Sequence, residues 1–328
     1  MTTRENSIPT DSSFFEGPEK KFEILTSPRC PSFRSYGRAR WEAIVRIAGA
    51  EILSHISNSH CDSYLLSESS LFVWDYRVLM ITCGRTTLAH AASQLLEGLK
   101  PEDIEFFIYE RKNEHFPELQ KLSFKDDVEL LRGFIEGETH RFGQIEEHHV
   151  YLFQMKSTHT PDPSDRTLEI LMHGIDPEVS GLFINNSLEG QHQKDWIRET
   201  LEVRELFPGF VIDDYLFEPH GYSLNAIKGN FYYTLHVTPQ SEGSYVSFET
   251  NYCTHGKSKE MAEKILKMFK PEHSDVLFFS PDKQKLPLHS SFSAKKMIDQ
   301  DLEGGFSVNY NQIKFNRHHA SLLDLDLR

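Results

Sequence analysis

Apolar and aromatic stretches along the chain predict a protein rich in β-strands. The longest is LFVWDYRVLMITC (71–83), which is β-branched and aromatic and is bounded on both sides by turn or cap residues. Four further segments have the same character: 150–156, 209–218, 230–239 and 244–252. A short PQSEG connection separates the last two and has the length of a hairpin turn. We expect each of these segments to form a strand.

Apolar residues at helical spacing predict helices set between groups of strands. These helices cover residues 39–56, 86–99, 126–137, 194–207 and 257–270. Adjacent strands with helices between the groups are typical of α+β proteins with antiparallel sheets. No repeat is evident at the level of residues. A Pro-, Ser- and Asp-rich segment at 157–165 is a soft candidate boundary, and taken alone it indicates only a surface loop.

Composition narrows the classes of function. The 328 residues suffice for one large domain or two small ones, and the 38% of hydrophobic residues is ordinary for a globular protein. A net charge of −14 argues against nonspecific nucleic-acid binding. No apolar run approaches a membrane-spanning length, and the polar residues 1–13 predict a disordered tail without a signal peptide. We therefore expect a cytoplasmic protein that binds neither nucleic acid nor membrane.

Cysteine and histidine patterns give no sign of a metal centre. The four cysteines are Cys30, Cys61, Cys83 and Cys253, and no two of them form a C-x-x-C pair. Neither a zinc site nor a disulfide framework is therefore predicted. Histidine pairs at 148–149 and 318–319 lack the spacing of known metal motifs, so no metal ligand is assigned.

Several short polar segments carry the candidate chemistry. They are FFEGPEKKFEI (14–24), YLLSESSLFV (64–73), PHGYSLNAI (219–227), TLHVTPQ (234–240) and YVSFETN (245–251). The last three place a serine, a histidine and a carboxylate on neighbouring strands. A serine within reach of a base is the usual requirement for attack by a hydroxyl group. Spacing alone leaves both Ser69 and Ser70 as candidate nucleophiles.

Together with TCG (82–84) and TLEILM (167–172), these segments stand in the order found in eukaryotic-type S-adenosylmethionine decarboxylases. The chain resembles that family from Phe14 to about Tyr310. The resemblance implies a four-layer αββα sandwich, with two antiparallel sheets face to face and helices outside, in a single domain over 14–328. It also implies decarboxylation of S-adenosylmethionine to make the aminopropyl donor for spermidine and spermine synthesis.

Decarboxylation of an α-amino acid leaves a carbanion that side chains cannot delocalise, so an electron sink is needed. The resemblance implies a covalent pyruvoyl group made from Ser69. In that scheme the Ser69 hydroxyl attacks the Glu68 carbonyl, and a base then removes the α-proton of residue 69. The chain separates into a β chain (1–68) and an α chain (69–328).

The family pattern assigns roles to further residues of the site. His236 is the base for the elimination, Ser223 assists processing, and Cys83 is the proton donor in turnover. Substrate contacts are assigned to Phe15 and Phe217, which sandwich the adenine, to the backbone of Leu66, and to Glu68. Glu16 and Glu19 fall at or near active-site positions. Gln240 stands where the family has a glutamate that binds the ribose hydroxyls, and its amide can accept one hydrogen bond and donate another.

Many family members hold putrescine, or an internal cation in its place, in a buried acidic pocket between the sheets. The matching residues are Glu23, Asp165, Thr167, Glu169, Glu249 and Tyr310. A lysine and an aromatic residue of animal relatives are replaced here by Ile81 and Ile108, whereas Lys21 replaces an apolar residue. We expect Lys21 to supply part of the positive charge, so that putrescine activates weakly or not at all. A homodimer of αβ units is left open, because relatives are monomers or dimers.

Two alternative functions are left open by the sequence. One is a pyruvoyl-dependent decarboxylase of ornithine or arginine on the same fold. The paired Phe15 and Phe217 argue against it, because a small substrate needs no adenine clamp, but Gln240 leaves it open. The other is a non-catalytic regulatory paralogue. Such a chain is expected to lack one of the four processing and catalytic residues, which are all present: Ser69, Cys83, Ser223 and His236.

Overall fold

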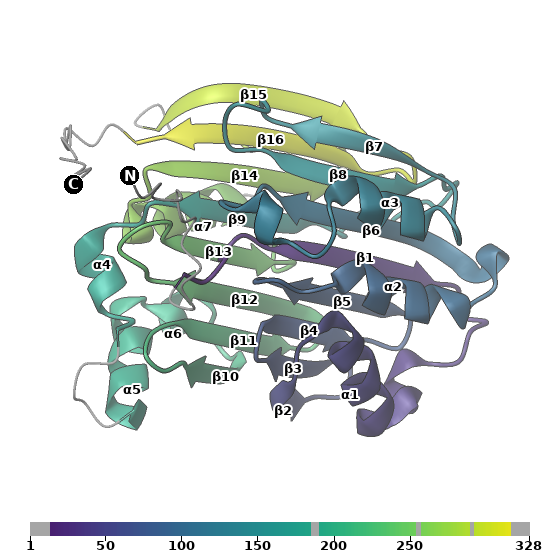
Figure 1. Cartoon of the computed structure of the whole chain (residues 1–328), viewed down its shortest axis with the longest axis horizontal. Helices are drawn as coiled ribbons and strands as arrows, with labels where there is room; N and C mark the ends of the chain where they lie inside the picture. The colour runs from purple at the N-terminus through teal and green to yellow at the C-terminus, as the bar shows by residue number, and fades with distance from the viewer. Residues whose placement is uncertain (1–13, 185–189, 254–256, 289–291, 316–328) are drawn as a thin grey trace, which may run out of the picture.

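Two eight-stranded antiparallel sheets lie face to face, with helices on their outer faces (Figure 1). The computed structural model describes residues 14–184, 190–253, 257–288 and 292–315. Within these ranges the predicted α+β sandwich is confirmed. The tail predicted at 1–13 lies outside the described residues.

Sheet A has the strand order β2-β3-β4-β5-β1-β6-β8-β7. Its strands are β1 (Lys20–Thr26), β2 (Ile52–Ser57), β3 (Asp62–Leu66), β4 (Ser69–Val73), β5 (Arg77–Thr82), β6 (Ile104–Lys112), β7 (Gly137–Phe142) and β8 (Val150–Met155). Its helices are α1 (Gly37–Ala48), α2 (Leu88–Glu97) and α3 (Phe124–Leu131), with short 3₁₀ segments η1 (Phe33–Tyr36), η2 (Pro101–Asp103) and η3 (Pro117–Leu119).

Sheet B has the order β10-β11-β12-β13-β9-β14-β16-β15. Its strands are β9 (Thr167–His173), β10 (Val211–Leu216), β11 (Tyr222–Lys228), β12 (Phe231–Thr238), β13 (Tyr245–Thr250), β14 (His273–Ser280), β15 (Ser293–Asp301) and β16 (Ser307–Lys314). Its helices are α4 (Pro177–Gly181), α5 (Gly190–Thr200), α6 (Val203–Leu206) and α7 (Lys257–Phe269).

The two sheets repeat one topology. In sheet A, β1 lies between β5 and β6, and in sheet B, β9 lies between β13 and β14. β1 therefore occupies the same place in sheet A as β9 does in sheet B (Figure 1). The strand order of sheet A is therefore repeated in sheet B, although the sequence shows no repeat.

Hydrophobic residues fill the space between the layers. One cluster, including Trp41 and Leu95, lies between sheet A and its helices, and another, including Leu266, lies between sheet B and its helices. Two smaller clusters combine residues of both sheets. Phe106 and Leu277 belong to one, and Phe72 and Tyr232 belong to the other. Charged side chains of the two sheets also form buried ion pairs with each other, so the space between the sheets is not uniformly apolar.

Four predicted elements differ from those observed. The helix predicted at 194–207 is divided into α5 and α6, and the helix predicted at 126–137 ends at Leu131. The segment 71–83 is not one strand but parts of β4 and β5, which turn at residues 74–76 and pair Val73 with Val78. Both strands are buried on both faces, so the apolar run hides the turn. The helix predicted at 39–56 ends at Ala48, because Gly49 adopts a left-handed conformation with φ +87° and caps the helix, and β2 follows.

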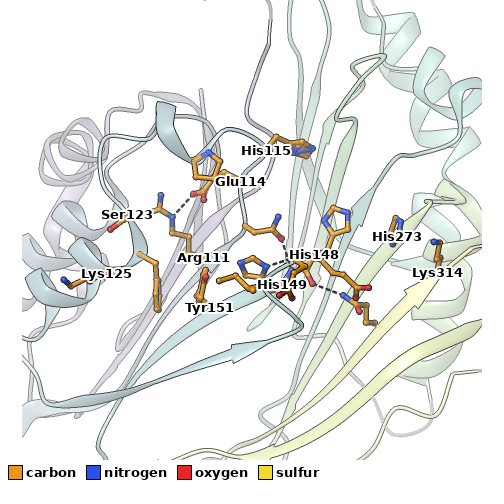
Figure 2. Close-up of a pocket in the computed structure, with 17 residues that line it drawn as sticks. Arg111, Glu114, His115, Ser123, Lys125, His148, His149, Tyr151, His273 and Lys314 are labelled. Carbon is orange, nitrogen blue, oxygen red and sulfur yellow. Dashed lines mark hydrogen bonds and ion pairs between the residues drawn. The ribbon is translucent and has the colours of Figure 1, made fainter. Parts of the chain in front are cut away.

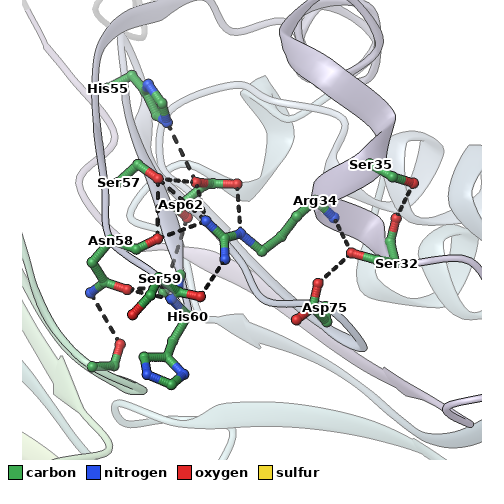
Figure 3. Close-up of polar contacts among 12 residues, drawn as sticks. Ser32, Arg34, Ser35, His55, Ser57, Asn58, Ser59, His60, Asp62 and Asp75 are labelled. Carbon is green, nitrogen blue, oxygen red and sulfur yellow. Dashed lines mark hydrogen bonds and ion pairs between the residues drawn. The ribbon is translucent and has the colours of Figure 1, made fainter.

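An arginine fixes the hairpin of β2 and β3 that leads to the candidate cleavage position. The Arg34 guanidinium binds both carboxylate oxygens of Asp62 at 3.1 Å, and it donates to the carbonyls of Asn58 at 2.7 Å and Ser59 at 2.8 Å (Figure 3). These contacts join the segment before α1 to the β2–β3 turn. No helix of the described ranges is long and apolar enough to cross a membrane.

A fully buried ion pair also joins the two sheets. The Lys112 ammonium at the end of β6 lies 3.0 Å from an Asp275 carboxylate oxygen in β14, and it donates to the His149 carbonyl at 2.9 Å. The Tyr310 hydroxyl donates to the other Asp275 oxygen at 2.6 Å. The anion of Asp275 is therefore held by a cation from the opposite sheet.

We predict that Lys112→Met destabilises the fold by about 3–5 kcal/mol, because it leaves the Asp275 carboxylate buried without its cation. Lys125→Met is the matched control, since Lys125 pairs with Glu129 on an exposed helix surface and is expected to have little effect. Urea unfolding followed by tryptophan fluorescence measures the difference. Equal midpoints for the two variants would contradict this assignment.

Candidate active site

A cavity of about 350 Å³ lies between the sheets, where the β3–β4 turn faces β11 and β12. Its size is that of a small-molecule site. The cavity is lined by seven of the residues that the sequence predicted: Phe15, Glu68, Ser69, Cys83, Phe217, Ser223 and His236. The structure thus brings together segments that are more than two hundred residues apart in the sequence.

Ser69 has an unusual backbone conformation at the edge of this cavity. Its φ of 138° lies in a region that non-glycine residues rarely adopt. The turn is tight, because Leu66 of β3 pairs directly with Ser69 of β4. The Ser69 Oγ is buried and has no hydrogen-bond partner among the described residues. The hydroxyl is therefore uncommitted beside the Glu68–Ser69 peptide bond.

The carbonyl of Glu68 accepts two hydrogen bonds from one residue. The Cys83 backbone N–H donates at 2.9 Å, and the Cys83 thiol donates at 3.3 Å. Donors that converge on one oxygen stabilise negative charge that develops there. The peptide bond before Ser69 is therefore polarised toward attack at its carbonyl carbon.

His236 is the buried base of the cavity. Its Nδ1 lies 2.8 Å from the Ser223 Oγ, which belongs to its cross-strand partner in β11. Burial lowers the pKa of His236 to about 3. The imidazole is therefore neutral at physiological pH and retains a lone pair that can accept a proton.

Burial also raises the pKa values of the carboxyl groups and the thiol around the cavity. It raises the pKa of Glu68 to about 7, and the nearby Lys20 opposes this shift. It raises the pKa of Glu19 to about 8, with a further contribution from the Glu169 carboxylate. The pKa of Cys83 is raised well above 9, first by desolvation and then by the carboxylates of Glu68 and Glu19. The thiol thus keeps its proton and is suited to donate it.

A glycine allows these groups to approach one another. Gly84 has φ +68°, and a Cβ at this position would lie 2.9 Å from a carboxylate oxygen of Glu68 and 3.3 Å from the ring of Phe15. The TCG motif therefore combines the donor Cys83 with the one residue that fits beside it.

Four predicted residues do not line the cavity in this structure. The Glu16 carboxylate accepts the backbone N–H groups of His115 at 2.8 Å and Phe116 at 3.0 Å. Leu66 has its side chain in the helix-facing core of sheet A. Glu19 is buried beside the cavity, and this burial is the main cause of its raised pKa. The direct roles of Glu16, Glu19 and Leu66 in substrate binding stay predictions.

Gln240, the fourth, holds the backbone of Phe15. Its Oε1 accepts the Phe15 N–H at 2.6 Å, and its Nε2 donates to the Phe15 carbonyl at 2.8 Å. A carboxylate at this position would be unable to make the second bond, since it has no proton to donate. The departure from the family pattern therefore has a structural consequence, and ribose binding by Gln240 stays a prediction.

The predicted acidic pocket is divided among three cations. The Lys21 ammonium contacts Glu110 at 2.8 Å, Glu169 at 2.9 Å and Glu249 at 3.0 Å, and all four side chains are buried. Glu23 and Asp165 instead bind Arg77, and Tyr310 binds the Asp275 that pairs with Lys112. Thr167 borders a space of only about 10 Å³ beside Lys21. Sequence reasoning missed Glu110, Arg77, Lys112 and Asp275.

A second, larger hollow lies apart from this cavity. It has a volume of about 1000 Å³ and is lined by several histidines, among them His115, His148, His149 and His273 (Figure 2). Burial, together with the charge of Lys112, lowers the pKa of His148 to about 4. Among the described residues, no group of three or more His, Cys, Asp or Glu side chains is placed to hold a metal ion.

The α+β sandwich encloses a cavity that holds a neutral base, a protonated thiol and a free hydroxyl group. These groups are typical of an enzyme active site. The family model described as adenosylmethionine decarboxylase matches residues 12–326. The chain belongs to this family, a family of decarboxylases, which confirms the resemblance seen in the sequence.

Individual relatives agree with this assignment. The chain is 34% identical over 291 residues to the S-adenosylmethionine decarboxylase proenzyme of Dictyostelium discoideum, a match that covers 83% of this chain and 76% of the relative. It is 33% identical to the proenzyme of Xenopus laevis over 322 residues, or 93% of each chain. The crystal structure of a Trypanosoma brucei AdoMetDC-delta26 monomer is similar with a TM-score of 0.57 and 25% identity, covering 75% of this chain and 99% of that one.

We predict that the Cys83 thiol in the folded protein reacts slowly with iodoacetamide at pH 7.5, because the thiolate is the reactive form and the raised pKa of Cys83 suppresses it. Peptide mass spectrometry after timed alkylation measures the rate at each cysteine. The same thiol in urea-unfolded protein is the control and should react at the ordinary rate. A rate in folded protein as fast as this control would contradict a protonated Cys83.

Proposed function

We propose that this protein cuts its own chain between Glu68 and Ser69 and then decarboxylates S-adenosylmethionine with a pyruvoyl group formed at position 69. The observation that carries the proposal is the pairing of a strained Ser69, whose hydroxyl is free, with a Glu68 carbonyl that accepts two hydrogen bonds from Cys83. The relatives' designation as proenzymes supports a processing step.

The proposed processing needs no group beyond the chain and water. The Ser69 Oγ attacks the Glu68 carbonyl carbon, and the C–N bond is replaced by an ester C–O bond. The charge that develops on the Glu68 oxygen is stabilised by Cys83. Removal of the α-proton of residue 69, with His236 as base, then breaks the ester and releases the Glu68 carboxylate. Addition of water at residue 69 and loss of ammonia complete the sequence.

In turnover, the pyruvoyl group would supply the electron sink that stabilises the carbanion left by carbon dioxide. The residues of the cavity supply binding and proton transfer. Phe15 and Phe217 both line it, which suits a flat adenine. The protonated thiol of Cys83 can deliver a proton to carbon. The decarboxylated product would be the aminopropyl donor for spermidine and spermine synthesis.

We predict that purified protein contains two chains, residues 1–68 and residues 69–328, and that Ser69→Ala remains a single chain. Intact mass spectrometry under denaturing conditions distinguishes these states and shows whether the larger chain begins in a pyruvoyl group. Ser67→Ala is the matched control: Ser67 lies in the same turn, accepts a bond from the Glu51 N–H at 3.0 Å, and is expected to leave processing intact.

Substrate and class are then tested by release of carbon dioxide. S-adenosylmethionine should be decarboxylated, whereas ornithine and arginine should not. Release from ornithine or arginine alone would favour the alternative decarboxylase. An uncut wild-type chain without activity would favour the regulatory paralogue instead.

We further propose that Lys21 takes the place of an activating diamine. Its ammonium already contacts three buried carboxylates, and the adjoining space of about 10 Å³ is no larger than a single water requires. Burial raises the pKa of Glu249 to about 7, and Lys21 opposes this shift, as expected for the cation that balances the site.

We predict that putrescine changes the activity of the wild-type enzyme less than about twofold, since a bound diamine would have to displace a buried ion pair. Lys21→Leu is expected to lose activity and to regain part of it when putrescine is added. Lys283→Leu is the control, because Lys283 pairs with Asp301 on the surface. Initial rates of carbon dioxide release with and without putrescine give the answer. Several-fold activation of the wild type would refute the proposal.

A further inference from the structure

A closed group of polar side chains lies behind the cavity and contacts the base. It consists of Ser70, Asn225, Thr234 and His236 and is called here the Asn225 cluster; all four are buried. The His236 Nε2 lies 2.8 Å from both the Ser70 and the Thr234 hydroxyl oxygens. Both hydroxyls also contact the Asn225 Oδ1, at 2.5 Å from Ser70 and 3.0 Å from Thr234.

The orientation of the Asn225 amide is fixed by the opposite sheet. Its Nδ2 donates to the Tyr64 carbonyl in β3 at 3.1 Å. If the amide were reversed, its oxygen would face the carbonyl oxygen of Tyr64, and two acceptors would meet without a proton. The Oδ1 therefore faces the two hydroxyls, and it can only accept.

Each hydroxyl has one proton, and both are taken by Asn225. Ser70 and Thr234 donate to the same Oδ1, so their oxygens present only lone pairs to the imidazole. The contacts at 2.8 Å from these oxygens to the His236 Nε2 then require a proton on that nitrogen. The two hydroxyl oxygens also lie 3.1 Å from each other, which makes five close polar contacts in the cluster. With an unprotonated Nε2, only the two hydroxyl protons are available for these five contacts. With a protonated Nε2, three protons satisfy four of them, and the contact between the two hydroxyls stays without a proton.

We infer that Asn225 is a positioning residue that fixes the tautomer of His236, with the proton on Nε2 and the lone pair on Nδ1 facing Ser223. This inference deepens the proposed function and rests on it for its consequence in processing. The Nδ1 lies 2.8 Å from the Ser223 hydroxyl, and both residues line the cavity. The nitrogen that is free to accept a proton is thus the one that contacts Ser223.

The strand geometry explains why these residues act together. Ser223 and Asn225 are two residues apart in β11, and Thr234 and His236 are two apart in β12, so each pair lies on one face of sheet B. Ser70 comes from β4 in sheet A and directly follows the proposed cleavage position. The tautomer of the base is therefore set by contacts with the strand that carries the reacting residue.

The tautomer is tested first in Ser69→Ala protein, which cannot process and so separates this test from the proposed function. In protein labelled with ¹⁵N-histidine, the Nδ1 and Nε2 shifts report which nitrogen carries the proton. The pKa of about 3 keeps His236 neutral at pH 5, where exposed histidines are charged. Its signals are assigned by their loss in a second protein that also carries His236→Gln. A proton on Nδ1 would overturn the inference even if wild-type protein processes normally.

The role in processing is tested by the rate at which newly synthesised chain is cut, followed on denaturing gels. Asn225→Leu removes the acceptor, frees both hydroxyls to donate to Nε2, and should slow cutting about tenfold or more, since general base catalysis contributes ~10²–10⁴-fold. Asn225→Asp should restore much of the rate. A buried, neutral carboxylic acid there can accept on one oxygen and donate to the Tyr64 carbonyl with the other.

A third variant serves as the matched control. Asn309→Leu removes another buried asparagine of sheet B, which donates to Asp299 and does not line the cavity, so the tautomer and the rate should change little. Thermal unfolding of the three variants checks for loss of the fold. If Asn225→Leu cuts as fast as wild type, or if Asn309→Leu is as slow as Asn225→Leu while both remain folded, the positioning role is wrong. A wild-type chain that is never cut would instead contradict the proposed function.

Discussion

The ammonium of Lys21 is the interaction on which the stacking of the sheets depends. Three carboxylates from β6, β9 and β13 lie within 3.0 Å of it, and all four side chains are buried. Without the cation, neighbouring buried carboxylates would repel one another or have to be protonated. The ion cluster therefore fixes the register of β1 in sheet A against β9 and β13 of sheet B. This register places Phe15 and Glu19, which precede β1, against the cavity.

Hydrogen bonds between uncharged groups hold the residues of the site in place. Gln240 binds both backbone groups of Phe15, and the Cys83 backbone binds the Glu68 carbonyl. The groups that would react are kept neutral by burial, as the pKa shifts of His236 and Cys83 show. Buried acidic side chains are thus gathered around Lys21, and the reactive groups line the cavity to one side of them.

The sequence allowed the fold and seven cavity residues to be predicted because short motifs stay together at the turns that carry them, as in YLLSESSLFV and PHGYS. It failed where a role depends on a partner across the sheets. Nothing in the sequence pairs Lys112 of β6 with Asp275 of β14, or Arg77 of β5 with Asp165, which precedes β9. Asn225 and Thr234 were a different omission. Each lies two residues from a predicted residue on a strand, and this period of two was a signal that could have identified both.

The backbone of Ser69 gives a physical reason for an uncut chain to react at this position. Its φ of 138° is unfavourable for an L-residue because the Cβ crowds the neighbouring peptide groups. The conformation is held by the pairing of Leu66 with Ser69 and by the donors on the Glu68 carbonyl. In the proposed reaction, the tetrahedral α-carbon of residue 69 becomes a planar carbon without a preceding peptide bond, so the strained φ no longer exists. The contacts that hold Ser69 in this conformation would thus keep backbone strain in the uncut chain, and cutting would release it.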